Sequence, residues 1–86
     1  MVEATATINV SSGLHARPAN LFIKTASKYK SDIKVSKDGK EVDGKRLLAI
    51  MTLGVQQGES ITIKAEGEDE SEAVRALEDL IERDFE

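Results

Sequence analysis

Apolar and polar residues alternate along three stretches of the chain, at residues 2–9, 33–37 and 60–65. Successive side chains of a β-strand point to opposite faces, so this alternation predicts three half-buried strands. The apolar face of the first strand consists of Val2, Ala4, Ala6 and Ile8. Each strand should therefore place one face against a core and the other toward solvent.

A hairpin is predicted directly after the second strand. The dipeptide Asp38-Gly39 is a strong signal for a two-residue turn, because both central positions of such a turn need positive φ. Residues 40–43 should form a short return strand, with Val42 facing inward. We interpret this hairpin as structural and assign no chemistry to it.

Three other stretches have apolar residues at helical spacing. The first helix follows Pro18, and its apolar stripe consists of Ala19, Phe22, Ile23 and Ala26. Residues 46–53 indicate a short helix whose common apolar face consists of Leu47, Ile50 and Met51. The last helix follows residues 69–72, and its stripe consists of Ala73, Ala76, Leu77, Leu80 and Ile81. We interpret this last helix as scaffold.

Local signals mark the ends of two of these helices. Gly54 should close the short helix as the left-handed residue after its last turn. At its start Arg46 is not a favoured N-cap, which leaves Asp43 as the cap if the helix begins early. Asp69 and Glu72 have the spacing of a capping box, a cap residue followed three positions later by an acid.

The predicted order of elements is strand, helix, strand, strand, short helix, strand, helix. Because so few strands and helices must all cover one apolar face, they predict an α+β two-layer sandwich with the other sheet face open to solvent. The sequence contains no linker, internal repeat or low-complexity segment. Residues 1–86 should therefore form a single domain with a modest core.

The composition of the chain indicates its cellular compartment. The chain has no cysteine and thus neither a disulfide framework nor thiol chemistry, so an intracellular home fits better than a secreted one. Its N-terminus lacks a basic region followed by a long apolar run, and no stretch approaches membrane-spanning length. We expect a cytoplasmic protein without membrane insertion.

The net charge of −4 is unevenly distributed. Residues 66–86 hold ten acids and two arginines, whereas residues 1–65 carry a net charge of +4. A basic face that would steer the chain toward acidic partners is expected around Arg17, Lys24, Lys45 and Arg46. The alternative is that these residues belong to an ordinary solvated charged surface without a binding role. The acidic C-terminal segment and the total of three aromatic residues argue against nucleic-acid binding.

The only histidine and the only proline lie close together in residues 11–19. Pro18 fits the first turn of a helix, so a helix should begin at or just before it. In one interpretation Arg17 is the cap and Pro18 the first helical residue, because a residue before proline avoids helical ψ. In the other, His15 is the cap and the helix starts at Ala16. Both place His15 at the N-terminus of the helix.

This helix start is a candidate anion site. First-turn amides without intrahelical partners, the positive end of the helix dipole and Arg17 converge beside the imidazole of His15. The positive helix end favours the neutral, nucleophilic imidazole, so the setting suggests a phosphoryl group carried on the histidine itself. The amide of Ala16 would meet its oxygens, Gly13 would bring backbone close to it, and Ser12 is a candidate side-chain donor. The alternative is an ordinary surface or cap histidine, with Ser12 as a turn residue.

Residues 13–19, Gly-Leu-His-Ala-Arg-Pro-Ala, resemble the phosphorylation-site signature of HPr. This family comprises the histidine-containing phosphocarriers of the bacterial phosphoenolpyruvate:sugar phosphotransferase system. The likeness covers essentially the whole chain, since further segments match in order and spacing at residues 26–29, 38–40, 50–55 and 65–70. It implies the open-faced sandwich of the family, a four-stranded antiparallel sheet backed by three helices.

The resemblance also implies a mechanism and partners. His15 would accept a phosphoryl group on Nδ1 from enzyme I, itself charged by phosphoenolpyruvate, and would pass it to the IIA domain of a sugar permease. Arg17 would neutralise the group, and the chain, as a monomer, would need no metal or cofactor. To the docking patch that the resemblance implies beside His15 we assign Leu47, Leu48 and Met51, with Lys24, Lys45 and Arg46. The alternative is that all three apolar residues belong to the core, which applies most to Met51 and Leu47.

The chain departs from the family pattern at position 46. Many relatives carry a serine there that a dedicated kinase phosphorylates. Arg46 cannot accept a phosphate ester, so we predict that this serine switch is absent and that the position carries a permanent positive charge.

Two other function classes compete with a phosphocarrier. The first is a regulatory binding module of the same fold that passes no phosphate, against which the presence of both His15 and Arg17 argues. The second is a small hydrolase with His15 as general base. It would need an acid poised against the histidine and a large pocket, for which the sequence offers no candidate.

Overall fold

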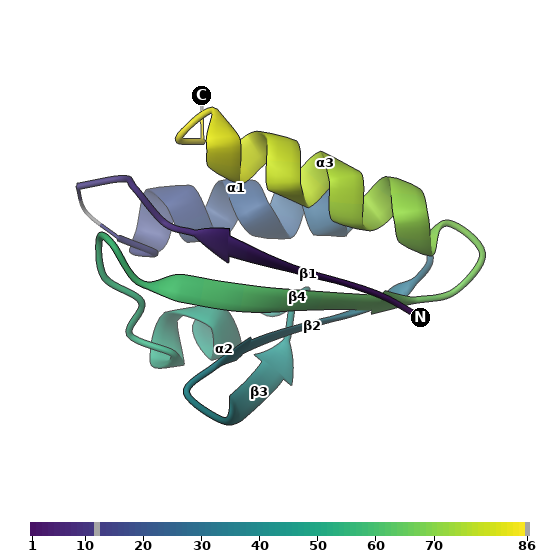
Figure 1. Ribbon diagram of the computed structural model, residues 1–86, viewed down its shortest axis with the longest axis horizontal. Coiled ribbons are helices and arrows are strands. Elements are labelled where there is room, and N and C mark those ends of the chain that lie inside the picture. Colours follow the sequence, from purple (N-terminus) through teal and green to yellow (C-terminus); the bar gives the residue numbers. More distant parts are fainter. Residues whose placement is uncertain (12, 86) are drawn as a thin grey trace.

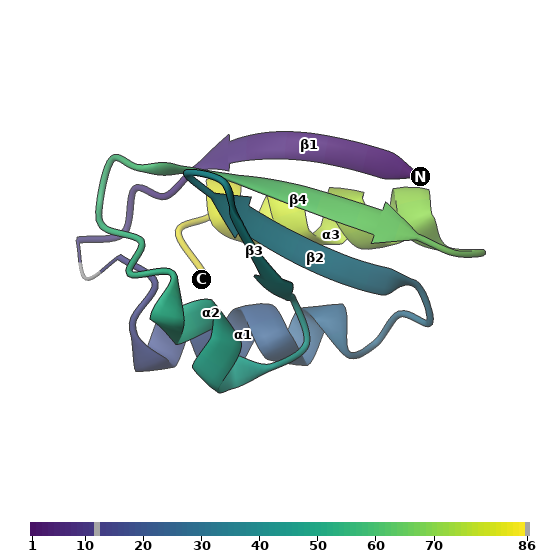
Figure 2. The same cartoon turned by 90° about the horizontal axis from the view of Figure 1, so that it is seen from below.

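The chain forms a four-stranded antiparallel sheet with three helices. The computed structural model describes residues 1–11 and 13–85. In chain order the elements are β1 (Val2–Thr7), α1 (Ala16–Ala26), β2 (Asp32–Lys37), β3 (Lys40–Asp43), α2 (Leu47–Thr52), β4 (Ser60–Glu66) and α3 (Glu70–Glu82). The strand order is β1-β4-β2-β3, and the helices pack on one side of the sheet (Figures 1 and 2). The predicted α+β open-faced sandwich is confirmed.

The core lies between the sheet and the helices. On the two central strands the inward side chains are Ile33, Val35, Ile61, Ile63 and Ala65, all buried. The predicted helical stripes are buried at Ala19, Phe22, Ala26, Ala73, Leu77, Leu80 and Ile81. Ile23 and Ala76, which also belong to these stripes, are only half-buried. Burial of the alternate residues of each strand against these stripes is the main apolar stabilisation of the domain.

The other sheet face is polar. Hydroxyl pairs join β1 to β4 across this face, Thr5 to Thr62 at 3.4 Å and Thr7 to Ser60 at 3.0 Å. Lys64 of β4 lies 3.4 Å from a carboxylate oxygen of Glu41 on β3. The alternation seen in the sequence therefore separates an apolar inner face from a polar outer one.

The predicted hairpin forms at the residues expected. Asp38 and Gly39 have φ of 50° and 83°, and Lys37 pairs with Lys40 across the turn. Val42 of the return strand is half-buried and packs against the core. A two-residue turn with both φ positive matches the twist of its strands.

The short helix α2 is one residue shorter at each end than predicted. Arg46 occupies the N-cap position without a side-chain cap hydrogen bond, and Gly54 follows the C-cap with φ 61°, as expected. Asp43 is not the cap of α2. Its Oδ1 instead accepts the amide of Lys45 at 2.9 Å, which stabilises the turn before the helix.

The capping box expected at the start of α3 does not form. Asp69 is the N-cap residue, but its side chain makes no cap hydrogen bond. The carboxylate turns toward the connection between α1 and β2, where Ser31 and Lys30 donate hydrogen bonds to it. Hydrogen bonding to the donors of that turn takes precedence over the local cap.

Among the helices in residues 1–11 and 13–85, none is long and apolar enough to span a membrane.

Candidate functional site

His15 stands immediately before α1. It is the N-cap residue, with extended backbone at φ −84° and ψ −172°, and its carbonyl accepts the amide of Ala19 at 2.9 Å. The helix thus starts at Ala16, and Pro18 is its third residue. Of the two starts considered, the one with His15 as cap is confirmed. Arg17 takes helical backbone despite preceding a proline, because Pro18 is buried and fixed in the first turn.

The first turn of α1 directs backbone donors outward beside His15. Pro18 has no amide hydrogen, so within residues 1–11 and 13–85 the first-turn donors without an acceptor are the amides of Ala16 and Arg17. The side chains of His15, Ala16 and Arg17 are all exposed. The positive end of the helix dipole lies at the same place. An anion that reached His15 would meet two amides and a guanidinium on an open surface.

Gly13 and Leu14 anchor the segment that presents His15. Gly13 is buried with φ 66°, and a Cβ added there would lie 2.4 Å from the carbonyl oxygen of Val55. The amide of Leu14 donates to that same oxygen at 3.0 Å. Glycine is therefore required at position 13 for close packing against the Val55 backbone, a reason that the sequence did not indicate. Ser12, a predicted phosphoryl donor, lies outside the described residues.

The predicted apolar docking residues lie at different depths on α2. Leu48 is 77% exposed and Met51 is 36% exposed, whereas Leu47 is half-buried against the core. Ile50, on the same helix, is fully buried. Helix α2 packs against α1 with its C-terminal end toward the segment that carries His15 (Figure 2). Leu48 and Met51, one turn apart, form the exposed apolar part of this surface.

The four basic residues assigned to the surface also differ. Arg17 and Lys24 are exposed and lie seven residues apart on α1, hence on the same side of that helix. Arg46 is exposed at the start of α2. Lys45 is half-buried, and its Nζ donates to the carbonyl oxygen of Tyr29 at 2.7 Å. Lys45 therefore joins the turn after α1 to the segment directly before α2.

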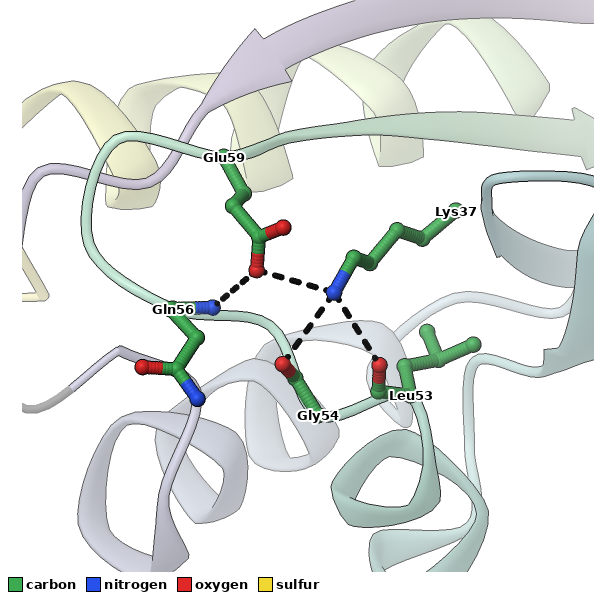
Figure 3. A network of polar contacts seen from close by, with 5 residues as sticks. All are labelled: Lys37, Leu53, Gly54, Gln56 and Glu59. Atoms are coloured by element: carbon green, nitrogen blue, oxygen red, sulfur yellow. Dashed lines mark hydrogen bonds and ion pairs between the residues drawn. The ribbon is translucent and has the colours of Figure 1, made fainter.

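Sequence reasoning missed a polar network centred on Lys37. Its Nζ donates to the carbonyl oxygens of Leu53 and Gly54, at 3.4 and 3.2 Å, and lies 2.8 Å from Oε1 of Glu59 (Figure 3). The same Oε1 accepts the amide of Gln56 at 2.8 Å. The hydrogen bond from Lys37, followed by that from the Gln56 amide, lowers the pKa of Glu59. No local pattern around Lys37 signals this role, because its partners are distant in sequence.

The described part of the chain offers no group of three or more histidine, cysteine, aspartate or glutamate side chains that could hold a metal ion. The donors at the start of α1 are amides and a guanidinium, which bind anions. The chemistry this arrangement supports is therefore binding of an anionic group next to an imidazole.

Comparison with known proteins gives consistent results. A family model described as the PTS HPr component phosphorylation site matches residues 2–83. The chain is similar to the HPr-like protein Crh of Halalkalibacterium halodurans, with 42% identity over 84 residues, covering 98% of this chain and 100% of that protein. It is similar to the crystal structure of HPr-C-His from Thermoanaerobacter tengcongensis, with 54% identity, a TM-score of 0.97 and coverage of 99% and 96%. It also resembles an HPr dimer from that organism, with 53% identity, a TM-score of 0.81 and coverage of 100% and 99%.

Proposed function

The chain belongs to the HPr family, and from this premise we propose that it is a phosphocarrier of the phosphotransferase system. It accepts a phosphoryl group on His15 from phospho-enzyme I and donates it to a IIA domain of a sugar permease. The observation that carries this proposal is that exposed His15 is the N-cap residue of α1, next in sequence to the first-turn amides of Ala16 and Arg17.

In the transfer one bond forms and one breaks. An unprotonated ring nitrogen of His15 attacks the phosphorus held on a histidine of enzyme I. The N–P bond to the donor imidazole breaks, and its electron pair returns to that ring. No proton has to move, because each imidazole keeps the hydrogen on its other nitrogen. The step to the IIA domain repeats the exchange, with the His15 ring as leaving group.

The start of α1 stabilises the group while it is carried. The phosphoryl oxygens are negative, and the amides of Ala16 and Arg17 point from the positive end of the helix dipole. The Arg17 guanidinium adds a charge-assisted donor. The two amides belong to one helix turn, so they need little rearrangement when the phosphoryl group arrives.

Both partners dock on the surface formed by α1 and the exposed side of α2. Leu48 and Met51 supply apolar area that no part of the described chain covers. Lys24 and Arg46 are exposed around it and favour acidic partner surfaces. Every residue needed lies on a single chain, so the carrier acts as a monomer, in the cytoplasm where its partners charge and discharge it.

A regulatory binding module is the second candidate, supported by the similarity to the HPr-like protein Crh. Such a module needs the docking surface but not a nucleophile at the helix start. The exposed imidazole of His15 favours the carrier.

The test is a mass measurement after incubation with enzyme I and phosphoenolpyruvate. The carrier gains the mass of one phosphoryl group in an acid-labile form, and the His15→Ala variant gains none. A wild-type chain that binds enzyme I but stays unlabelled would establish the regulatory module instead.

A further inference from the structure

The network of Lys37 and Glu59 fixes both ends of one loop, residues 53–59. At the first end, the Lys37 ammonium donates to the carbonyls of Leu53, the C-cap residue of α2, and of Gly54, which follows it. At the second end, it pairs with Glu59 directly before β4. The Lys37 side chain is only 14% exposed, and Figure 3 shows its ammonium between Glu59 and the two carbonyls.

The same loop holds the segment that presents His15. The carbonyl of Val55 accepts the amide of Leu14, the residue before His15, at 3.0 Å. Farther back, the amide of Ile8 donates to the Glu59 carbonyl at 2.9 Å, and the amide of Gly58 donates to the Ile8 carbonyl at 2.7 Å. The position of His15 is thus set by backbone hydrogen bonds to a loop whose ends are fixed by Lys37 and Glu59.

We propose that Lys37 and Glu59 are positioning residues for phosphoryl transfer at His15, acting through the loop 53–59 and the Leu14 amide. This inference deepens the proposed function and rests on it. Neither residue touches the phosphoryl group. Their ion pair keeps the Val55 carbonyl in place, and this carbonyl orients the imidazole relative to the first turn of α1. Transfer between two histidines is in-line, so a small displacement of the nucleophile lowers the rate of phosphoryl transfer without weakening the binding of enzyme I.

The proposal is tested with Lys37→Met and Glu59→Gln, each measured for transfer from phospho-enzyme I at increasing carrier concentration. Two variants serve as matched controls. Lys40→Met removes another ammonium at the end of α2, one that lies 3.4 Å from the Thr52 carbonyl. Among the described residues the ion-pair partner of Glu59 is Lys37 and not Lys40. Lys64→Met removes the ammonium that pairs with Glu41 on the open sheet face. All three methionine variants lose one positive charge.

We expect the maximal transfer rate to fall about tenfold in Lys37→Met and Glu59→Gln, with KM changed less than about twofold. The two controls should stay within about twofold of wild type in both quantities. Lys37→Arg should recover most of the rate, because a guanidinium can donate to the same carbonyls and carboxylate. Hydrogen exchange of the Leu14 amide should accelerate in Lys37→Met and Glu59→Gln and not in Lys64→Met.

Three outcomes would overturn the inference. One is a maximal rate in Lys37→Met equal to that of Lys64→Met. Another is a slow Lys37→Met whose Leu14 amide stays as protected as in wild type, since the effect would then not pass through the loop. The third is a defect confined to KM. A wild-type chain that enzyme I does not label would instead refute the proposed function, so the two failures are distinct.

Discussion

Asp69 at the start of α3 accepts hydrogen bonds from both the amide and the hydroxyl of Ser31, across 38 positions of sequence. The Ser31 amide lies 2.9 Å from Oδ1, and the Lys30 amide lies 2.8 Å from Oδ2. Ser31 is 1% exposed, so its donors have little access to water. The carboxylate thereby joins the connection after α1 to the start of α3. An unpaired buried donor is costly, which explains why this pairing displaces the local cap.

This contact makes stability depend on pH. The Ser31 hydroxyl, and then the Lys30 amide, lower the pKa of Asp69 from 3.8. A carboxyl with a lowered folded-state pKa stabilises the fold fully above its unfolded pKa, and this stability is lost as pH falls through the folded pKa. We expect Asp69→Asn to lower Tm by about 5 °C at pH 7, and this difference from wild type should shrink as the pH is lowered below 3.8, in thermal melts followed by circular dichroism.

The control for that experiment is Glu68→Gln, which removes an exposed neighbouring acid. It should leave Tm nearly unchanged at both pH values, because exposed surface charges contribute little. Equal Tm losses for Asp69→Asn at neutral and acid pH would show that the ionised carboxylate is not what Ser31 requires.

The glycine at position 13 gives a second prediction. Gly13→Ala meets two costs, a positive φ of 66° and a Cβ only 2.4 Å from the Val55 carbonyl oxygen. Gly54→Ala meets the first cost alone, since its φ is 61° and nothing lies within 4 Å of the added Cβ. We expect losses of unfolding free energy of about 1 kcal/mol for Gly54→Ala and about 3 kcal/mol for Gly13→Ala in urea titrations.

Gly13→Ala should also slow phosphorylation of His15, because relieving the clash displaces the hydrogen bond between Leu14 and Val55. Gly54→Ala should be phosphorylated at nearly the wild-type rate, because the added Cβ meets nothing within 4 Å and the carbonyl of residue 54 can stay on Lys37. Similar stability losses in the two variants would indicate that the loop moves aside at no cost and that only backbone conformation matters at position 13.

Elements defined by local patterns could be predicted from the sequence. Alternation located the strands, and Asp38-Gly39 located the hairpin, because both signals depend on residues that are neighbours in the chain. Where a side chain can hydrogen-bond either to a residue nearby in sequence or to a distant one, the partner could not be predicted. Asp69 and Glu72 have the spacing of a capping box, so the sequence predicted a local cap. The carboxylate of Asp69 binds Ser31 instead, and Ser31 becomes its neighbour only in the folded domain.

The candidate site was predictable to the same extent. His15 and Arg17 stand out by residue type, and Pro18 limits the helix start to two choices. The choice between them depends on a contact that is distant in sequence. The Val55 carbonyl accepts the amide of Leu14 and so fixes this residue outside the helix, and His15 is then the cap. Lys37 could not be found in this way, since a lysine at the end of a strand is an ordinary surface residue until α2 brings its C-terminal carbonyls there.

Arg17 should matter to the phosphorylated form and not to the fold. Its side chain is exposed, so Arg17→Gln is expected to change the free energy of unfolding by less than about 0.5 kcal/mol. If its guanidinium meets the phosphoryl oxygens, loss of the charge should slow transfer at least about tenfold. Lys28→Gln, a matched loss of one exposed charge after the last turn of α1, should transfer normally. Equal rates in the two variants would limit the role of Arg17 to general charge.

The exposed apolar side chains of α2 predict a separation of docking from folding. Leu48 is 77% exposed, so Leu48→Ser should leave Tm unchanged or raise it slightly, while Ile50→Val, at a fully buried position, should cost about 1 kcal/mol. If Leu48 packs into a pocket of enzyme I, its loss should raise KM about tenfold without lowering the maximal transfer rate. Titration of enzyme I with each variant measures this directly. A Leu48→Ser protein with normal KM would place the docking contacts elsewhere on the surface. A fall confined to the maximal transfer rate would mean that α2 orients His15 and does not bind the partner.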